Sequence, residues 1–287
     1  MTLARIAVMT DTNSGMTPDE ARQLGVALLA MPFTVDERSC FEHLDISHEE
    51  FYRLQAQGAD IASSQPAPAD LLSMWDELLE DNDFVLYIPM TSGLSGSCAT
   101  ATALAQDYDG KVLVVDNRRI SVPLKQAVLE AVHLRNAGRS ARQIADRLTE
   151  KASESHIYIT VEDLSFLKKT GRITPAVAAV GTVLNIKPVM KILDGKLDMH
   201  CKVRGMKQAR QTMLDAVRAD LEGDFAGKKV IIAAAYSGDR EQGEAWAEVV
   251  RQEFADLPFM SDPLPLSIGC HVGPGALGAA VFTDCDE

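Results

Sequence analysis

The sequence has few cysteines, and none of them lie close together. Its 287 residues include Cys40, Cys98, Cys201, Cys270 and Cys285, an odd number without a C-x-x-C pair. Disulfide frameworks and structural zinc sites need paired or closely spaced cysteines. We therefore expect no metal ion, no disulfide framework, and reduced thiols in a cytoplasmic protein.

The sequence also lacks a long hydrophobic run. No stretch approaches the ~18 uninterrupted apolar residues that read as a membrane-spanning helix. The residues from Met1 to Met9 do not combine a charged region with a long apolar run, as a secretory signal would. We expect a protein that neither crosses a membrane nor is exported.

Positive charge is scarce, because 28 Lys and Arg stand against 41 Asp and Glu, for a net charge of −13. This balance repels polyanions and excludes general binding to nucleic acid or to anionic membranes. A P-loop and the protein-kinase motif set are missing as well. Phosphoryl transfer from ATP is therefore not expected on this chain.

Short apolar runs alternate with helical stretches, which is typical of a parallel α/β sheet whose strands are buried on both faces. The predicted strands of this kind are Ile6–Met9, Phe84–Ile88, Val112–Val115 and Ile157–Val161. Three helices have plausible capping boxes at their starts. The paired residues are Thr17 with Glu20, Ser47 with Glu50, and Ser140 with Gln143.

From Asp163 onward the predicted elements are mixed. Lys187–Ile192 and Lys196–Val203 flank an Asp194-Gly195 turn and predict an antiparallel hairpin. Further elements are predicted at Gly205–Leu221 (helix), Val230–Ala235 (strand), Arg240–Phe254 (helix) and Ala276–Phe282 (strand). At about 150 residues per domain, we expect an α/β protein with an N-terminal domain, 1–154, and a C-terminal mixed α/β domain, 155–287.

Two segments place small hydrogen-bonding residues beside glycines, Thr91–Gly96 and His271–Gly278. Glycines let backbone N–H groups approach a ligand closely, so both segments favour binding of a carboxylate or a phosphate. Ser63-Ser64-Gln65 stands between two predicted helices. It fits either an anion-binding loop at a helix N-terminus or ordinary helix capping.

Gly93-Leu94-Ser95-Gly96-Ser97 resembles the nucleophile elbow G-x-S-x-G of α/β-hydrolases, but Ser97 replaces the last glycine. An esterase or acyl hydrolase that uses Ser95 with a histidine base is therefore the alternative function. The G-x-G-x-x-G pattern at Gly273–Gly278 is not taken as a dinucleotide site. It lies too near the chain end to leave room for the ribose-binding acid.

Two basic stretches stand out in this acidic chain. In the first, Lys168 and Lys169 precede Arg172, which we expect to turn inward and neutralise a buried carboxylate. The common explanation for such a run is a solvated helix end. The second stretch is predicted to form a surface patch for a partner, and its members are Lys202, Arg204, Lys207 and Arg210.

Several segments together resemble the DegV family, in order and over nearly the whole chain. They are Asp11-Thr12, Ser63–Pro66, Ser92–Gly96, Asp116, Phe166–Ile173, Leu184–Pro188, Arg204-Gly205 and His271–Gly278. The resemblance implies a two-domain α/β fold, a tunnel for one long-chain fatty acid, and no other cofactor. It also implies a carrier subunit that is not itself an enzyme.

The resemblance assigns the fatty-acid carboxylate to Ser63, Ser95 and His271, with Arg172 ordering its surroundings. A supporting loop around the head group is expected from Ser64, Gln65, Ser92, Gly93, Gly96, Gly273 and Gly275. His271 would balance the carboxylate if protonated and donate one hydrogen bond if neutral, and the sequence leaves both open.

The implied partner is a separate fatty acid kinase related to dihydroxyacetone kinases, which would contact Arg204 and phosphorylate the bound acid. The resulting acyl phosphate would be carried onward for phospholipid synthesis, with transient contact at a membrane surface. We expect a monomer. The chain departs from the family pattern at Thr12-Asn13-Ser14, Ala67 and Thr170.

Overall fold

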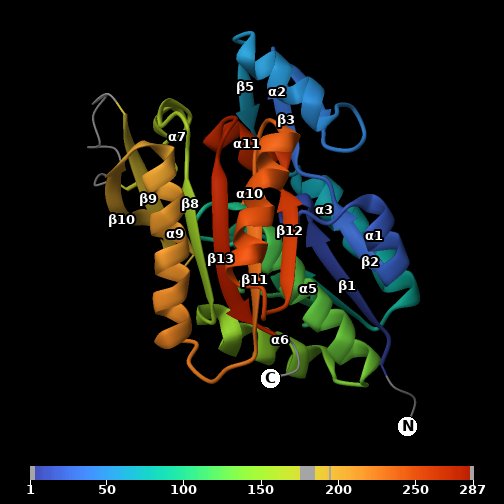
Figure 1. Ribbon diagram of the computed structural model, residues 1–287. Helices are drawn as coiled ribbons and strands as arrows, with labels where there is room; N and C mark the ends of the chain where they lie inside the picture. Colours follow the sequence, from blue (N-terminus) through green and yellow to red (C-terminus); the bar gives the residue numbers. More distant parts are fainter. Residues whose placement is uncertain (1–3, 175–184, 194, 285–287) are drawn as a thin grey trace.

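The computed structural model describes residues 4–174, 185–193 and 195–284 (Figure 1). Leu184 and Asp194, which belong to two of the segments above, lie outside the described residues. The described chain contains a parallel sheet, a mixed sheet and a small three-stranded sheet. None of its helices is long and apolar enough to cross a membrane.

The first sheet has the strand order β2-β1-β6-β7. Its strands are β1 (Ile6–Asp11), β2 (Val26–Leu29), β6 (Phe84–Ile88) and β7 (Val112–Val114). All its pairings are parallel, which confirms the prediction for the N-terminal part. The connecting elements are η1 (Thr12–Ser14), α1 (Pro18–Leu24), α3 (Pro68–Asp81), α4 (Ser97–Leu104) and η2 (Ala105–Tyr108).

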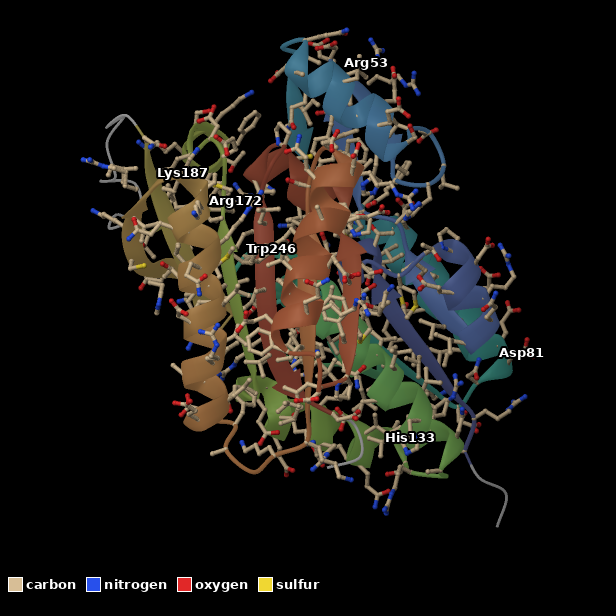
Figure 2. All side chains as sticks on the ribbon, in the orientation of Figure 1. Arg53, Asp81, His133, Arg172, Lys187 and Trp246 are labelled. Atoms are coloured by element: carbon tan, nitrogen blue, oxygen red, sulfur yellow. The ribbon has the colours of Figure 1, made fainter. Side chains whose placement is uncertain are left out.

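The second sheet has the order β10-β9-β8-β13-β11-β12. Its strands are β8 (Ser155–Thr160), β9 (Ile186–Leu193), β10 (Lys196–Arg204), β11 (Val230–Tyr236), β12 (Phe259–Pro263) and β13 (Leu277–Thr283). Helices α9 (Gly205–Glu222) and α10 (Arg240–Glu253) cover its outer face (Figure 1). Trp246 of α10 is buried there and donates its indole N–H to the Gly278 carbonyl at 2.8 Å (Figure 2).

The prediction that Ile157–Val161 belongs to a parallel sheet is wrong, because β8 pairs antiparallel with both β9 and β13. The apolar run reports burial on two faces, which a central strand of a mixed sheet also has. Strand direction depends on the connections, and these are not visible in a five-residue pattern. The predicted mixed character of the C-terminal part is confirmed.

A small unit, which we call the cap, sits over the end of the second sheet (Figure 1). It comprises β3 (Pro32–Val35), β4 (Arg38–Phe41), α2 (His48–Ala56) and β5 (Ile61–Ser63). Phe33, Phe51 and Leu266 belong to one buried cluster, which joins the cap to α11 (Leu266–Val272). The predicted loop therefore begins in a strand, since Ser63 lies opposite Phe33 in β3.

Two of the three predicted capping boxes are confirmed, at Thr17 and at Ser140. The third is only half formed. Ser47 Oγ accepts the N–H of Glu50 at 3.2 Å, but the Glu50 carboxylate is held by the Arg53 guanidinium at 2.6 and 2.8 Å. The ion pair one turn along the helix keeps this carboxylate from returning to the Ser47 backbone.

Helix α5 (Ser121–Asn136) is buried along most of its length between the two larger sheets. It is followed by α6 (Ala141–Glu150) and η3 (Lys151–Ser153), and α7 (Ser165–Thr170) comes after β8. The largest apolar cluster includes Val8, Leu124, Ile159 and Met190, so it draws on both predicted domains. The division at 154/155 stays a prediction.

Candidate functional site

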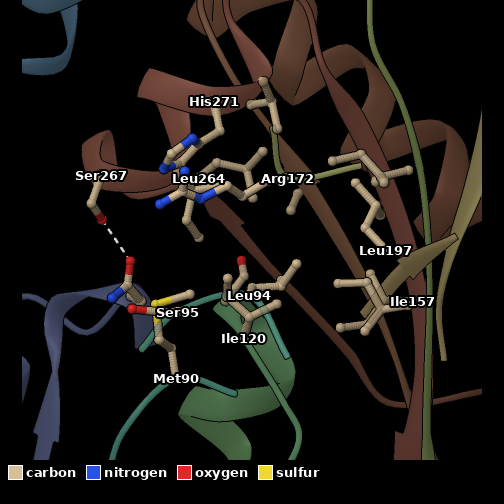
Figure 3. Close-up of a pocket in the computed structure, with 18 of the residues that line it drawn as sticks. Met90, Leu94, Ser95, Ile120, Ile157, Arg172, Leu197, Leu264, Ser267 and His271 are labelled. Atoms are coloured by element: carbon tan, nitrogen blue, oxygen red, sulfur yellow. Dashed lines mark hydrogen bonds between the residues drawn. The ribbon is translucent and has the colours of Figure 1, made fainter. Parts of the chain in front are cut away.

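A cavity of about 330 Å³ lies between the inner face of the second sheet, the start of α5 and helix α11. Most of its lining is apolar, with Leu94, Ile157, Leu197 and Ile268 among the contributors. His271 and the Arg172 guanidinium lie close together on one side of the pocket, and Ile157 and Leu197 lie on the opposite side (Figure 3). The cavity therefore has a polar end and an apolar end.

The structure brings all four predicted carboxylate-binding residues to this cavity: Ser63, Ser95, Arg172 and His271. Ser63 comes from the last position of β5 in the cap, and His271 from the last turn of α11. Ser63 Oγ and His271 Nε2 lie 2.7 Å apart and hydrogen-bond across a sequence separation of 208 residues. This pair fixes the imidazole at the polar end.

The imidazole of His271 is neutral at pH 7. Burial disfavours its charged form, and the nearby Arg172 charge adds to this, so that its pKa is lowered to about 4. Its Nδ1 is buried and has no hydrogen-bond partner in the described part of the protein. The choice that the sequence left open is thus decided by burial.

Arg172 lies at the mouth of the cavity and is an exposed residue. Its guanidinium donates to the Thr170 carbonyl two residues earlier. Figure 3 shows the guanidinium directed toward His271. The side chain therefore turns toward the site, as expected, but it places its charge at the entrance and not in the interior.

Ser95, Gly96, Ser64 and Gln65 also line the cavity. Ser95 Oγ accepts the N–H of Ser97 at 3.2 Å and donates to Ser97 Oγ at 3.0 Å. The Gln65 carboxamide lies over Gly96, where a Cβ would come within 2.6 Å of Gln65 Nε2. The two loops that approach the polar end are therefore packed directly on each other.

Ser92 and Gly93 do not line the cavity. The N–H of Ser92 is donated to Asp116 Oδ1 at 3.3 Å, and that of Gly93 to Thr91 Oγ1 at 3.1 Å. A Cβ on Gly93 would lie 2.3 Å from the carbonyl oxygen of Gly195 in the β9–β10 turn. Glycine is needed here for close packing of two chain segments, and not for approach of a ligand.

Gly273 and Gly275 also lie outside the cavity lining. Both have positive φ, 68° and 80°. Their N–H groups are donated to the carbonyls of Gly269 and Ser237, at 3.0 and 2.9 Å. A Cβ on Gly273 would meet the ring of Phe166 at 2.4 Å. These glycines turn the chain from α11 into β13, and their amides are already used within the protein.

Asn13 and Ser267, which were not predicted as site residues, both line the cavity. Ser267 Oγ donates to Asn13 Oδ1 at 2.6 Å, drawn as the dashed line in Figure 3. The signal available was the spacing of Ser267 and His271, four residues apart on one helix face. Next to Asn13, the carboxyl of Asp11 is fully buried, and this burial raises its pKa to about 6.

Within residues 4–174, 185–193 and 195–284, Ser95 has no histidine base, because the hydrogen bond of His271 Nε2 goes to Ser63 and that of Ser95 to Ser97. A hydrolytic triad also needs a carboxylate on the second imidazole nitrogen. In the described residues, His271 Nδ1 has no such partner. The arrangement holds an anion more readily than it activates a nucleophile.

Arg204 lies away from the cavity lining. It is exposed at the end of β10, where its backbone N–H is donated to Gln208 Oε1 at 3.0 Å in the first turn of α9. Lys202, Lys207 and Arg210 are exposed around it. In the first basic stretch, Lys169 forms an ion pair with Asp60 of the cap at 2.7 Å.

One group of side chains in the described chain could hold a metal ion: His156, Asp220 and Asp224. His156 Nδ1 lies 2.8 Å from Asp220 Oδ2, and the ammonium of Lys191 lies 3.1 Å from the same nitrogen. Tyr158 donates its hydroxyl to Asp220 at 2.8 Å. These partners already neutralise the carboxylate, and none of the group lines the cavity.

The sequence of this chain matches one family of known proteins. The family model described as "Uncharacterised protein, DegV family" matches residues 5–284. A DegV domain-containing protein of Deinococcus radiodurans is 32% identical over 280 residues, which cover 96% of this chain and 98% of that protein.

Solved structures show the same likeness. A DegV family protein from Thermus thermophilus, whose structure is described as showing fatty acid binding, has a TM-score of 0.87 at 31% identity, covering 97% of this chain and 99% of that one. A DegV protein from Bacillus subtilis shares the fold, with a TM-score of 0.87 at 24% identity over 98% of this chain and 100% of that one. This chain belongs to the DegV family.

Proposed function

We propose that this protein binds one long-chain fatty acid, with its chain in the apolar part of the cavity and its carboxylate at Ser63, Ser95 and His271. The observation that carries the proposal is the mainly apolar cavity that ends at the hydrogen-bonded Ser63–His271 pair. The fatty acid binding described for the Thermus thermophilus relative supports it.

Most of the binding affinity would come from the acyl chain of the fatty acid. Burying each methylene contributes roughly 0.8 kcal/mol, so a long chain supplies on the order of ten kcal/mol before ordering costs are subtracted. A carboxylate buried without partners would cancel much of this gain. The Ser63–His271 pair uses one proton in its own hydrogen bond, so it would donate one hydrogen bond to the carboxylate and Ser95 a second. Each is worth about 1.5–3 kcal/mol when charge-assisted, and together they would offset that cost.

Arg172 would set the orientation of the ligand. Its positive charge stands at the mouth, so it attracts the carboxylate and leaves the apolar end of the cavity for the chain. A carboxylate held near the surface can be reached by a second protein. We propose that a separate ATP-dependent kinase phosphorylates it there, contacts Arg204, and leaves the acyl phosphate on this carrier.

Native mass spectrometry of the freshly purified protein tests the binding proposal. We expect a mass increment equal to one fatty acid, which denaturation releases for identification. A bare protein that also fails to take up added oleate would contradict the proposal. For the kinase step, the protein incubated alone with ATP and oleate should form no acyl phosphate, and product in that assay would overturn the carrier role.

A further inference from the structure

On the inner face of the second sheet, the side chains of β11 and β13 change in size along the strands. The two strands are antiparallel, so directly opposed residues point to the same face. The opposed pairs on the inner face, starting nearest the polar end, are Ala235 with Gly278, Ala233 with Ala280, and Ile231 with Phe282.

The first two pairs form a trough in the floor of the cavity. Their four residues line it and offer only a methyl group or a hydrogen. Successive pairs are two residues apart, which corresponds to about 6.7 Å along a strand. A chain lying in this trough can therefore extend over two such steps before the side chains change.

The third pair closes the trough. Phe282 is fully buried and Ile231 is 7% exposed, and neither lines the cavity. Val122 of α5 does line it, and it packs with both side chains in one buried cluster. The floor thus rises from methyl groups to a benzyl ring within one step along the sheet.

The trough leads away from the polar end. The carbonyl of Tyr236, the last residue of β11, accepts the N–H of Leu264 at 2.6 Å, and α11 begins two residues later. Ala235 is therefore the end of the trough nearer to His271, and Phe282 is the far end. A ligand that is anchored at His271 and whose acyl chain follows the trough would point its methyl end at Phe282.

We propose that Phe282, backed by Ile231 and Val122, is the end wall that sets the longest acyl chain this protein accepts. This proposal rests on the proposed binding of a fatty acid. Up to the wall, each added methylene enters an apolar environment and raises the affinity about fourfold. Beyond it, further methylenes meet a packed ring and lower the affinity.

The test is the dissociation constant of saturated fatty acids from decanoic to docosanoic acid, measured by displacement of a fluorescent fatty acid. In Phe282→Ala we expect the chain length of tightest binding to increase by two or more methylenes. In Ala280→Val, which fills the trough one step earlier, we expect it to decrease. Phe282→Leu should shift the optimum in the same direction as Phe282→Ala, by less, and keeps the test available if the alanine variant does not fold.

The matched control is Phe225→Ala, because Phe225 is equally buried but lies in the cluster on the opposite face of the sheet. It should keep the wild-type optimum. An unchanged optimum in the folded Phe282 and Ala280 variants would overturn the end wall and leave fatty acid binding intact. A wild-type protein that binds none of these acids would instead overturn the proposed function, and the end wall with it.

Discussion

At the scale of single residues, His271 decides the electrostatics of the site. Its neutral imidazole offers one hydrogen bond to an anion without bringing a full charge into the interior. Arg172 supplies the charge from the mouth. Because the charge of Arg172 lies at the mouth, this cation is not buried in the cavity. Burying a cation there without a bound carboxylate would cost free energy.

The lowered pKa of His271 makes stability depend on pH. The unfolded chain takes up this proton near pH 6.5, whereas the folded protein does so only near pH 4. The contribution is therefore full above pH 6.5 and is lost as the pH falls from 6.5 to 4, by at most about 3 kcal/mol. Urea unfolding of wild type and His271→Gln at pH 7.5 and pH 5 measures it.

We expect the free energy of unfolding of the wild type to fall more than that of His271→Gln between these two values. Comparing the two proteins cancels the opposite effect of Asp11. Its pKa is raised by burial, so Asp11 adds stability as the pH falls below 6. Equal pH dependence of both proteins would show that His271 is not desolvated in the native state.

The hydroxyl groups of Ser63 and Ser95 should act on the binding of a fatty acid. Ser63→Ala or Ser95→Ala removes a hydroxyl that would hold the carboxylate through a charge-assisted hydrogen bond. We therefore expect a 10- to 100-fold loss of affinity for oleate, about 1.5–3 kcal/mol. Ser39→Ala is the control, because Ser39 lies on β4 of the same small sheet but not at the cavity. Titration calorimetry with oleate measures the affinities, and an unchanged affinity in both site variants would contradict the assignment.

At the scale of elements, the short helix α11 carries both Ser267 and His271 and is held at its start by the cap. Pro265 precedes the helix and provides no side-chain cap. Instead the buried carboxylate of Glu42 accepts the N–H of Leu266 at 3.0 Å and also lies 2.7 Å from His48 Nε2. A carboxylate from the segment that follows β4 thus supplies the cap that the local sequence lacks.

Glu42→Ala should therefore weaken both the fold and the site. Loss of the interaction at the helix start is expected to lower the free energy of unfolding by about 1–3 kcal/mol and to weaken oleate binding through His271. Glu49→Ala, at an exposed position of α2, serves as the control. Denaturant unfolding measures the stability of the wild type and the two variants, and calorimetry measures their affinity for oleate. A Glu42→Ala variant as stable as Glu49→Ala would mean that Glu42 does not stabilise the start of α11.

Local signals located most elements. Capping boxes at Thr17 and Ser140 predicted two helix starts correctly, because the partners lie within one turn. The strand Ile61–Ser63 was missed, since three residues are too few for a periodic pattern and its pairing partner is Phe33–Val35. The direction of β8 was predicted wrongly because it depends on pairing with β9 and β13, which come later in the chain.

At the scale of the whole molecule, one close contact between glycines links the β9–β10 turn of the second sheet to the loop that carries Ser95. Gly195 in the β9–β10 turn packs against Thr91 and Gly93 of the loop that carries Ser95. Thr91 Oγ1 donates to the Gly195 carbonyl at 3.2 Å. The position of the Ser95 loop therefore depends on a hairpin more than a hundred positions away.

Gly93→Ala tests this contact. Its added Cβ would lie 2.3 Å from a backbone oxygen that cannot rotate away, so we expect a loss of more than about 2 kcal/mol of stability and weaker oleate binding. Gly110→Ala is the matched control. Gly110 has φ +77° but no atom within 4 Å of an added Cβ, so only backbone strain of about 1 kcal/mol is expected. Thermal unfolding measures the loss of stability in each variant. An equal loss in both would contradict the close approach of Gly93 to Gly195.

The sequence by itself determined the α/β class, most helix starts and the family, and it pointed to four residues that line one cavity. Those properties depend on local periodicity, composition and motifs, which are written within short stretches of chain. Only the tertiary structure decided that His271 is neutral, that Ser63 holds it, that four of the predicted loop residues lie outside the cavity lining, and that the trough stops at Phe282. Burial and hydrogen bonding between segments up to 208 residues apart set these properties, and neither can be computed from a local pattern.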